Sequence, residues 1–159
     1  METKLADLVE AVASGLGERH WQLATAESCT GGWIAKVLTD RAGSSSWFDR
    51  GFVTYSNQSK QDMLGVLPRT LSEYGAVSRE TVLEMAGGAL ANSSAQLSVA
   101  VSGIAGPGGG TAEKPVGTVW LAWGSPDGVE AVCEHFTGDR EDVRRLTVMR
   151  ALQGLLDRL

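Results

Sequence analysis

A strand, a sharp turn and the start of a helix follow one another in the segment Gln22-Leu23-Ala24-Thr25-Ala26-Glu27-Ser28-Cys29-Thr30-Gly31-Gly32. Its first six residues are typical of a short buried strand, and the apolar residues after the glycines recur at helical spacing. A hydroxyl and a thiol stand side by side at the turn. Backbone N–H groups at a helix start have no partner within the helix and carry the positive end of its dipole, so they suit a developing negative charge. The segment therefore predicts an α/β unit with a candidate nucleophile at the end of its strand.

Outward from this segment, helical and strand patterns alternate, and an antiparallel hairpin follows late in the chain. Helices are expected over residues 5–19, around Ile34, Val37 and Leu38, from a cap at Asn57 through Leu64, behind a cap at Ser78 and behind a cap at Asp139. Strands are expected over residues 22–27, 52–55, 97–102, 117–123 and 129–136, with residues 42–46 as a loop and a weak signal over residues 67–75. This order predicts one layered α/β domain over residues 1–159, a mixed β-sheet flanked by helices.

Composition narrows the classes of function. The formal net charge of −5 disfavours a nucleic-acid partner, whose binding surface would be basic. The two cysteines and two histidines are isolated in the sequence, which disfavours a metal site. No run of residues is long and apolar enough for a membrane span, and free thiols fit a reducing compartment, so we expect a cytoplasmic protein with no membrane partner.

The turn offers three possible nucleophiles. Ser28 lies where ligands bind in open α/β sheets, at the carboxyl end of a strand. Cys29 is the rival, because a thiolate is the stronger nucleophile, although buried cysteines are usually inert. Thr30 is better suited to capping or binding. The alternative for the whole turn is purely structural, a helix cap followed by two closely packed glycines.

A serine nucleophile needs a base, and neither histidine is well placed. His20 ends a helix, and His135 alternates with apolar residues on a late strand. A lysine serves as a base when burial leaves it neutral. Lys60 is the candidate, since it lies on the first or second turn of a helix that follows a second strand, and Tyr55 is expected at the end of that strand. The alternative for Lys60 is an ordinary solvated helix lysine.

Two further segments suit an anionic ligand. The glycine-rich run after the clearest strand, residues 102–111, lets backbone N–H groups approach a ligand, although its spacing fits neither a Walker loop nor the dinucleotide fingerprint. Arg140 lies in the first turn of the last helix, where its guanidinium could hold a phosphate. The alternatives are a mobile surface loop and a salt-bridged helix start.

Together these segments resemble one family, the CinA C-terminal domain family. The resemblance rests on six motifs in order along nearly the whole chain: Ala26-Glu-Ser-Cys-Thr-Gly-Gly32, Gly51-Phe-Val-Thr-Tyr-Ser-Asn57 with Lys60, Gly75-Ala-Val-Ser78, Ser102-Gly-Ile-Ala-Gly-Pro107, Lys114-Pro-Val-Gly-Thr-Val119 and Gly138-Asp-Arg140. It implies hydrolysis of the carboxamide of nicotinamide mononucleotide (NMN) to nicotinate mononucleotide and ammonia, without metal or cofactor.

The resemblance also implies roles for individual residues. Ser28 would be the nucleophile, Lys60 its base, and Tyr55 a group that assists proton transfer or orients the amide. The expected substrate-binding residues are Thr30, Gly31, Gly32, Gly103, Ala105, Gly106, Gly108, Gly109 and Arg140.

Two other functions stay open at this stage: a catalytically silent nucleotide-binding or regulatory module, and an amidase for another small carboxamide. We also expect a homo-oligomer, with a dimer as the first candidate. The strands that hold Trp120 and Trp123 could form its interface or belong to the core.

Overall fold

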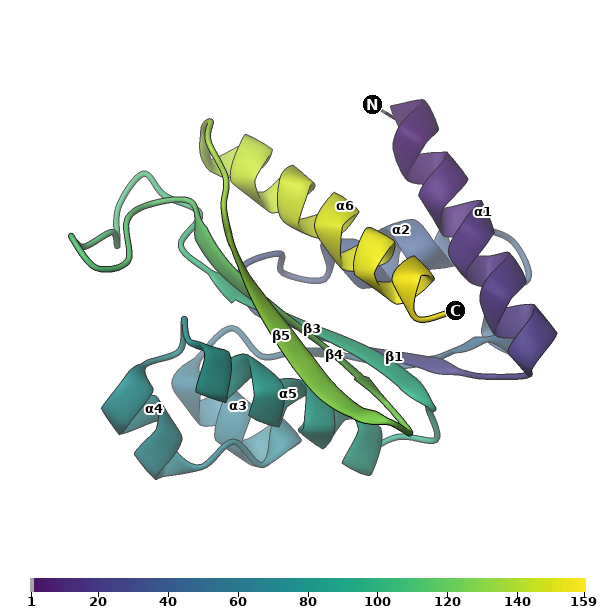
Figure 1. Ribbon diagram of the computed structural model, residues 1–159, viewed down its shortest axis with the longest axis horizontal. Helices are drawn as coiled ribbons and strands as arrows, with labels where there is room; N and C mark the ends of the chain where they lie inside the picture. The colour runs from purple at the N-terminus through teal and green to yellow at the C-terminus, as the bar shows by residue number, and fades with distance from the viewer. Residues whose placement is uncertain (1) are drawn as a thin grey trace.

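The computed structural model describes residues 2–159, whose five strands form one mixed sheet in the order β2-β1-β3-β4-β5 (Figure 1). The strands are β1 (Leu23–Glu27), β2 (Phe48–Val53), β3 (Leu97–Gly103), β4 (Thr118–Ser125) and β5 (Gly128–His135). Strand β1 lies between β2 and β3 and pairs in parallel with both, whereas β4 and β5 are antiparallel to their neighbours. The mixed sheet flanked by helices that the sequence predicted is confirmed.

Helices cover both faces of the sheet (Figure 1). One layer consists of α1 (Glu2–Arg19), α2 (Trp33–Thr39) and α6 (Arg140–Asp157), and the other of α3 (Asn57–Leu64), α4 (Pro68–Tyr74) and α5 (Arg79–Ala91). A short 3₁₀ turn, η1 (Ser44–Ser46), precedes β2. None of the helices within residues 2–159 is long and apolar enough to cross a membrane.

Each face of the sheet has its own apolar core. The core beneath α1, α2 and α6 includes Leu16, Leu38 and Leu152, and the core beneath α3, α4 and α5 includes Met85. Trp123 of β4 is fully buried, and its indole N–H donates a hydrogen bond to the Ala151 carbonyl of α6 at 3.0 Å. That tryptophan therefore belongs to the core and not to a surface.

Three differences from the sequence prediction concern the chain between β2 and α5. Strand β2 runs from Phe48 to Val53, so Tyr55 lies beyond the strand instead of ending it. Ser56, not Asn57, caps α3, because its hydroxyl accepts the Ser59 N–H and Ser59 bonds back to the Ser56 N–H. Helix α4 falls where the sequence signal was weak, and it begins with Pro68, whose fixed φ and missing N–H suit a first helical turn.

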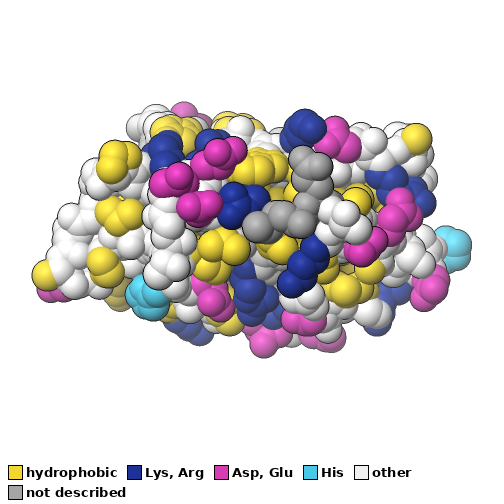
Figure 2. Space-filling model, turned by 90° about the horizontal axis from the view of Figure 1, so that it is seen from above, with side chains coloured by type: hydrophobic (Ala, Val, Ile, Leu, Met, Phe, Trp, Pro, Cys, Tyr) yellow, Lys and Arg dark blue, Asp and Glu magenta, His cyan; other side chains and the backbone are white. Residues whose placement is uncertain are grey.

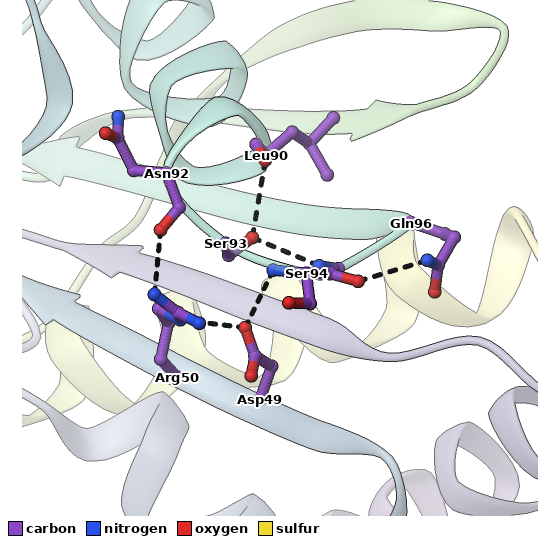
Figure 3. Close-up of polar contacts among 8 residues, drawn as sticks. Asp49, Arg50, Leu90, Asn92, Ser93, Ser94 and Gln96 are labelled. Atoms are coloured by element: carbon purple, nitrogen blue, oxygen red, sulfur yellow. Dashed lines mark hydrogen bonds and ion pairs between the residues drawn. The ribbon is translucent and has the colours of Figure 1, made fainter.

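A polar network fixes the end of the sheet opposite the functional site (Figure 3). The Asp49 carboxylate of β2 accepts hydrogen bonds from the Ser94 N–H at 3.0 Å and from Arg50 Nε at 2.8 Å. Arg50 also donates to the Asn92 carbonyl at 3.1 Å. These bonds tie the edge strand β2 to the loop that leads into β3, and the Ser94 N–H and Arg50 lower the pKa of Asp49.

The connections from β1 and β2 leave the sheet on opposite faces. After β1 the chain enters α2 in one layer, and after β2 it enters α3 in the other (Figure 1). Since the two strands are parallel neighbours, their carboxyl ends lie at the same edge of the sheet, where open α/β folds form crevices. Open α/β sheets bind ligands in such crevices.

Candidate active site

A cavity of about 220 Å³ lies at the carboxyl ends of β1, β2 and β3. Residues from the turn after β1, the segment after β2, the α4–α5 loop, the end of β3 and the start of α6 meet there. They are Ser28, Cys29, Tyr55, Asn57, Lys60, Ala76, Val77, Ser102, Gly103, Ala105 and Arg140. The six cavity residues that the sequence predicted for the site are Ser28, Tyr55, Lys60, Gly103, Ala105 and Arg140.

Ser28 and Lys60 both line this cavity and contact each other. The Lys60 ammonium lies 2.9 Å from Ser28 Oγ and donates a second hydrogen bond to the Thr54 carbonyl at 2.6 Å. Ser28 is 8% exposed and Lys60 1% exposed, so the pair is shielded from bulk water. The solvated-lysine alternative is therefore wrong for Lys60.

Burial changes the protonation of Lys60. Removal of the ammonium from water lowers its pKa from 10.5 to about 8. No ion pair joins Lys60 to a carboxylate in the described part of the chain to oppose this shift. Near neutral pH a fraction of the lysines is therefore neutral, with a lone pair that can accept a proton from Ser28.

Burial shifts the pKa of the Cys29 thiol away from its reactive form, in contrast to its effect on Lys60. Burial raises its pKa to about 11, with the Glu27 charge acting in the same direction. Because the thiolate is the nucleophilic form of cysteine, this thiol is poorly activated. The environment favours Ser28 over Cys29 as the nucleophile.

A buried carboxylate organises the turn between β1 and α2. Glu27, 1% exposed, accepts hydrogen bonds from the Thr30 hydroxyl at 2.6 Å and the Ile34 N–H at 2.8 Å on one oxygen. Its other oxygen accepts the Ala35 N–H at 3.0 Å. Glu27 thus replaces the side-chain cap that Gly32 cannot supply, and the carboxylate interacts favourably with the start of α2.

Tyr55 and Arg140 lie at the mouth of the cavity. Tyr55 is 63% exposed, and its hydroxyl accepts a hydrogen bond from Arg140 Nη2 at 3.1 Å. Arg140 Nη1 donates to the Gly106 carbonyl at 2.8 Å. Arg140 therefore connects the segment after β2 with the glycine-rich loop after β3.

The remaining predicted binding residues lie outside the cavity lining: Thr30, Gly31, Gly32, Gly106, Gly108 and Gly109. The Thr30 hydroxyl is engaged by Glu27, and the Gly31 N–H donates to the Ser28 carbonyl at 3.1 Å. Gly108 and Gly109 are exposed on the loop beyond the cavity. Their part in binding stays a prediction.

Four lining residues were not among the predicted site residues: Asn57, Ala76, Val77 and Ser102. Ser102, 1% exposed, is the last residue but one of β3, the strand that the sequence marked most clearly, and no described residue hydrogen-bonds its hydroxyl. Its position near the carboxyl end of a strand was the one feature of the sequence that could have identified Ser102 as a site residue. Ala76 and Val77 belong to a quoted motif, but only the packing of the α4–α5 loop brings them to the site.

Neither histidine reaches the cavity. His20 follows α1 in a left-handed conformation with a φ of 55°, and His135 ends β5 at the surface. Within residues 2–159, no group of three His, Cys, Asp or Glu side chains could hold a metal ion. The reactive side chains that line the cavity include the Ser28 hydroxyl, the Cys29 thiol and the Lys60 amine.

The fold and the cavity define an α/β protein with a serine–lysine pair at the carboxyl edge of its parallel strands. Residues 5–159 match the CinA C-terminal domain, and the chain belongs to that family.

Proteins of known name and structure resemble the chain over nearly its full length. It is 54% identical over 156 residues to the nicotinamide-nucleotide amidohydrolase PncC of Escherichia coli strain K12, covering 97% of this chain and 94% of the relative. PncC of Pseudomonas putida is 53% identical over 154 residues, covering 94% and 96%. The crystal structure of the competence/damage inducible protein CihA from Agrobacterium tumefaciens superposes with a TM-score of 0.94 at 49% identity, covering 97% and 94%.

Proposed function

We propose that this chain is a nicotinamide-nucleotide amidohydrolase that hydrolyses the carboxamide of NMN through a serine nucleophile and a lysine base. The contact of 2.9 Å between Lys60 Nζ and Ser28 Oγ in a buried cavity supports this proposal most directly. Relatives at 53–54% identity named as PncC point to the same substrate.

In the first half-reaction, Ser28 Oγ attacks the carboxamide carbon while neutral Lys60 takes the hydroxyl proton. The tetrahedral intermediate carries its negative charge on the former carbonyl oxygen. When the C–N bond breaks, Lys60 returns the proton to the amine, and ammonia leaves. The product is an ester between Ser28 and the nicotinoyl group.

In the second half-reaction, a water molecule attacks the ester carbon and gives a proton to Lys60. Collapse of the second intermediate breaks the bond to Ser28 Oγ, which recovers its proton from Lys60. Nicotinate mononucleotide leaves, and the serine–lysine pair is restored. The Thr54 carbonyl, at 2.6 Å, would hold the lysine in place through both transfers.

The rest of the substrate would extend out of the cavity. A cavity of about 220 Å³ suits the pyridinium ring, so the ribose phosphate would lie toward the mouth formed by Tyr55 and Arg140. The exposed glycines of the loop after β3 lie beyond that mouth and offer backbone N–H groups to a phosphate.

Ammonia release tests this function. The wild type should release ammonia from NMN faster than from nicotinamide or a simple amide, because only NMN has the phosphate. Ser28→Ala and Lys60→Ala should fall to the background rate, a loss of about 10,000-fold or more. Cys29→Ala is the matched control at the neighbouring position and should keep most of the activity.

Each alternative has its own outcome. No ammonia from any amide with folded wild type would indicate a silent binding module. Equal rates with NMN and nicotinamide would show that the phosphate does not contribute to recognition, and would favour an amidase for other carboxamides. Activity retained in Ser28→Ala but lost in Cys29→Ala would transfer the nucleophile to the thiol.

A further inference from the structure

The guanidinium of Arg144 holds the turn between β1 and α2 from outside the cavity. We call this turn, residues 28–32, the nucleophile turn. Arg144 of α6 donates from Nε to the Cys29 carbonyl at 3.0 Å and from Nη2 to the Thr30 carbonyl at 3.2 Å. Its guanidinium also lies 5.7 Å from the centre of the Trp33 ring. No carboxylate of the described residues forms an ion pair with it, so its charge acts on the turn itself.

These two bonds constrain the N–H groups of the turn. In a trans peptide the N–H points away from the C=O of the same unit, so a Cys29 carbonyl fixed on Arg144 directs the Thr30 N–H to the other side. Ser28 and Cys29 line the cavity, whereas Arg144 does not, so we expect this N–H to face the cavity although the Thr30 side chain does not line it. The next N–H, that of Gly31, already donates to the Ser28 carbonyl.

The Thr30 N–H is thus left as a donor. No described residue accepts a hydrogen bond from it, although the Thr30 side chain is fixed by Glu27 at 2.6 Å and its carbonyl by Arg144 at 3.2 Å. A donor whose residue is held at two points needs little reorganisation when charge develops nearby. A cation bound to the carbonyl of a peptide also polarises its N–H.

We propose that Arg144 is a positioning residue that orients and polarises the Thr30 N–H as an oxyanion donor for attack by Ser28. The inference rests on the proposed function, because an oxyanion forms only if the site performs acyl transfer. Arg144 would act through the peptide and would touch neither the substrate nor the reacting atoms.

The test compares Arg144→Met and Arg144→Lys with Arg150→Met. Arg150 is the matched control, since it lies on the same helix, packs 4.9 Å from the Trp123 ring and contacts Glu134, away from the turn. For Arg144→Met we expect kcat for NMN to fall roughly 100-fold with KM nearly unchanged, the loss typical of one oxyanion donor. The kcat of Arg144→Lys should lie between those of the wild type and Arg144→Met, because an ammonium lacks the planar fork with which a guanidinium donates to both carbonyls.

Binding of two ligands separates positioning from general structural damage. The analogue of NMN with an aldehyde in place of the carboxamide can form a tetrahedral adduct with Ser28. Its Kd should rise in Arg144→Met by about the factor lost in kcat, whereas the Kd of nicotinate mononucleotide should change less than about threefold.

Equal weakening of both ligands, or the same kinetics in Arg144→Met and Arg150→Met, would overturn the inference and leave the amidohydrolase proposal intact. A wild type without activity on NMN would overturn the proposed function and this inference with it.

Discussion

At the scale of single residues, the lowered pKa of Lys60 makes activity depend on pH. A general base must be neutral, and a pKa of about 8 leaves about a tenth of the lysines neutral at pH 7. We therefore expect kcat/KM for NMN to rise about tenfold per pH unit below 8 and to level off above it. Initial rates of ammonia release from pH 6 to 10 measure this profile.

Two variants control for this assignment. Lys60→Arg should be inactive throughout the range, because a guanidinium stays charged. Lys36→Met removes an exposed lysine that pairs with Asp40 at 2.7 Å, and its pH profile should match the wild type. A wild-type profile that is flat from pH 6 to 9 would contradict a base with the pKa of Lys60.

The same shift predicts how stability depends on pH. Between about pH 8 and 10.5 the unfolded chain keeps the Lys60 proton and the folded chain has lost it, so the free energy of unfolding rises with pH. Below pH 8 both states are protonated and the full cost of burying the charge remains. Lys60→Met lacks this group, so wild-type stability relative to Lys60→Met should increase by about 3 kcal/mol from pH 8 to 10.5.

Urea unfolding of both proteins at pH 7.5, 9 and 10.5 measures that difference, and groups common to both chains largely cancel. The variant should keep a native far-UV spectrum, because methionine has a similar length and removes a buried charge. A difference that stays constant over this range would mean that Lys60 titrates alike in the folded and unfolded chains.

At the scale of elements, the position of Lys60 depends on how closely α3 packs against α5. A Cβ at Gly88 of α5 would overlap the Leu64 carbonyl oxygen at the end of α3. Gly88→Ala must therefore push the two helices apart, and we expect a loss of about 1–3 kcal/mol in stability. Since Lys60 lies one turn before Leu64, kcat should fall as well, measured by ammonia release under conditions where the variant is folded.

Gly87→Ala is the matched control on the neighbouring residue. Nothing lies within 4 Å of a Cβ at that position, so alanine should stabilise the helix by about 0.5–1 kcal/mol without changing kcat. Equal effects of the two substitutions would show that helix propensity, and not the contact between α3 and α5, sets the outcome.

The elements with a strong hydrophobic period were predictable from the sequence, and those with a weak one were not. The helix behind Ser78 and the buried strand β3 lie where the pattern placed them. Strand β2 is exposed at the edge of the sheet and begins with Phe48, Asp49 and Arg50, so no regular alternation marks its start. Helix α4 has only two buried residues, which gives too weak a stripe to recognise.

The site was predictable where it follows strand ends and, for Arg140, at a helix start. Ser28 and Lys60 come after parallel neighbours, and the structure brings them within hydrogen-bonding distance, although their roles stay predictions. The contacts of Arg144 with the turn join residues more than a hundred positions apart. Such contacts leave no local pattern in the sequence, because only tertiary packing brings α6 to the turn.

At the scale of the whole molecule, the proposed site is assembled from both helical layers. The nucleophile turn is held by α2 and α6 on one face of the sheet, and Lys60 belongs to α3 on the other (Figure 1). The α1–α2–α6 side also has a groove of about 600 Å³ lined by apolar residues such as Leu5 and Trp33 and by charged side chains. Figure 2 shows the same mixture of acidic, basic and apolar groups on the face seen from above. We expect activity to depend on the packing of both helical layers, because each supplies part of the proposed site.

Gly154 of α6 allows a test of that dependence far from the cavity. A Cβ there would overlap the Trp123 ring in the core beneath α6, so Gly154→Ala should lower the free energy of unfolding by about 1–3 kcal/mol. Because both layers build the site, ammonia release and far-UV circular dichroism should be lost at the same urea midpoint, and the substitution should shift both midpoints equally. Gly17→Ala in α1, with nothing within 4 Å of its Cβ, should shift neither midpoint downward. If activity were lost well before the circular dichroism signal in wild type, the site would instead open as a local unit of lower stability than the sheet that supports it.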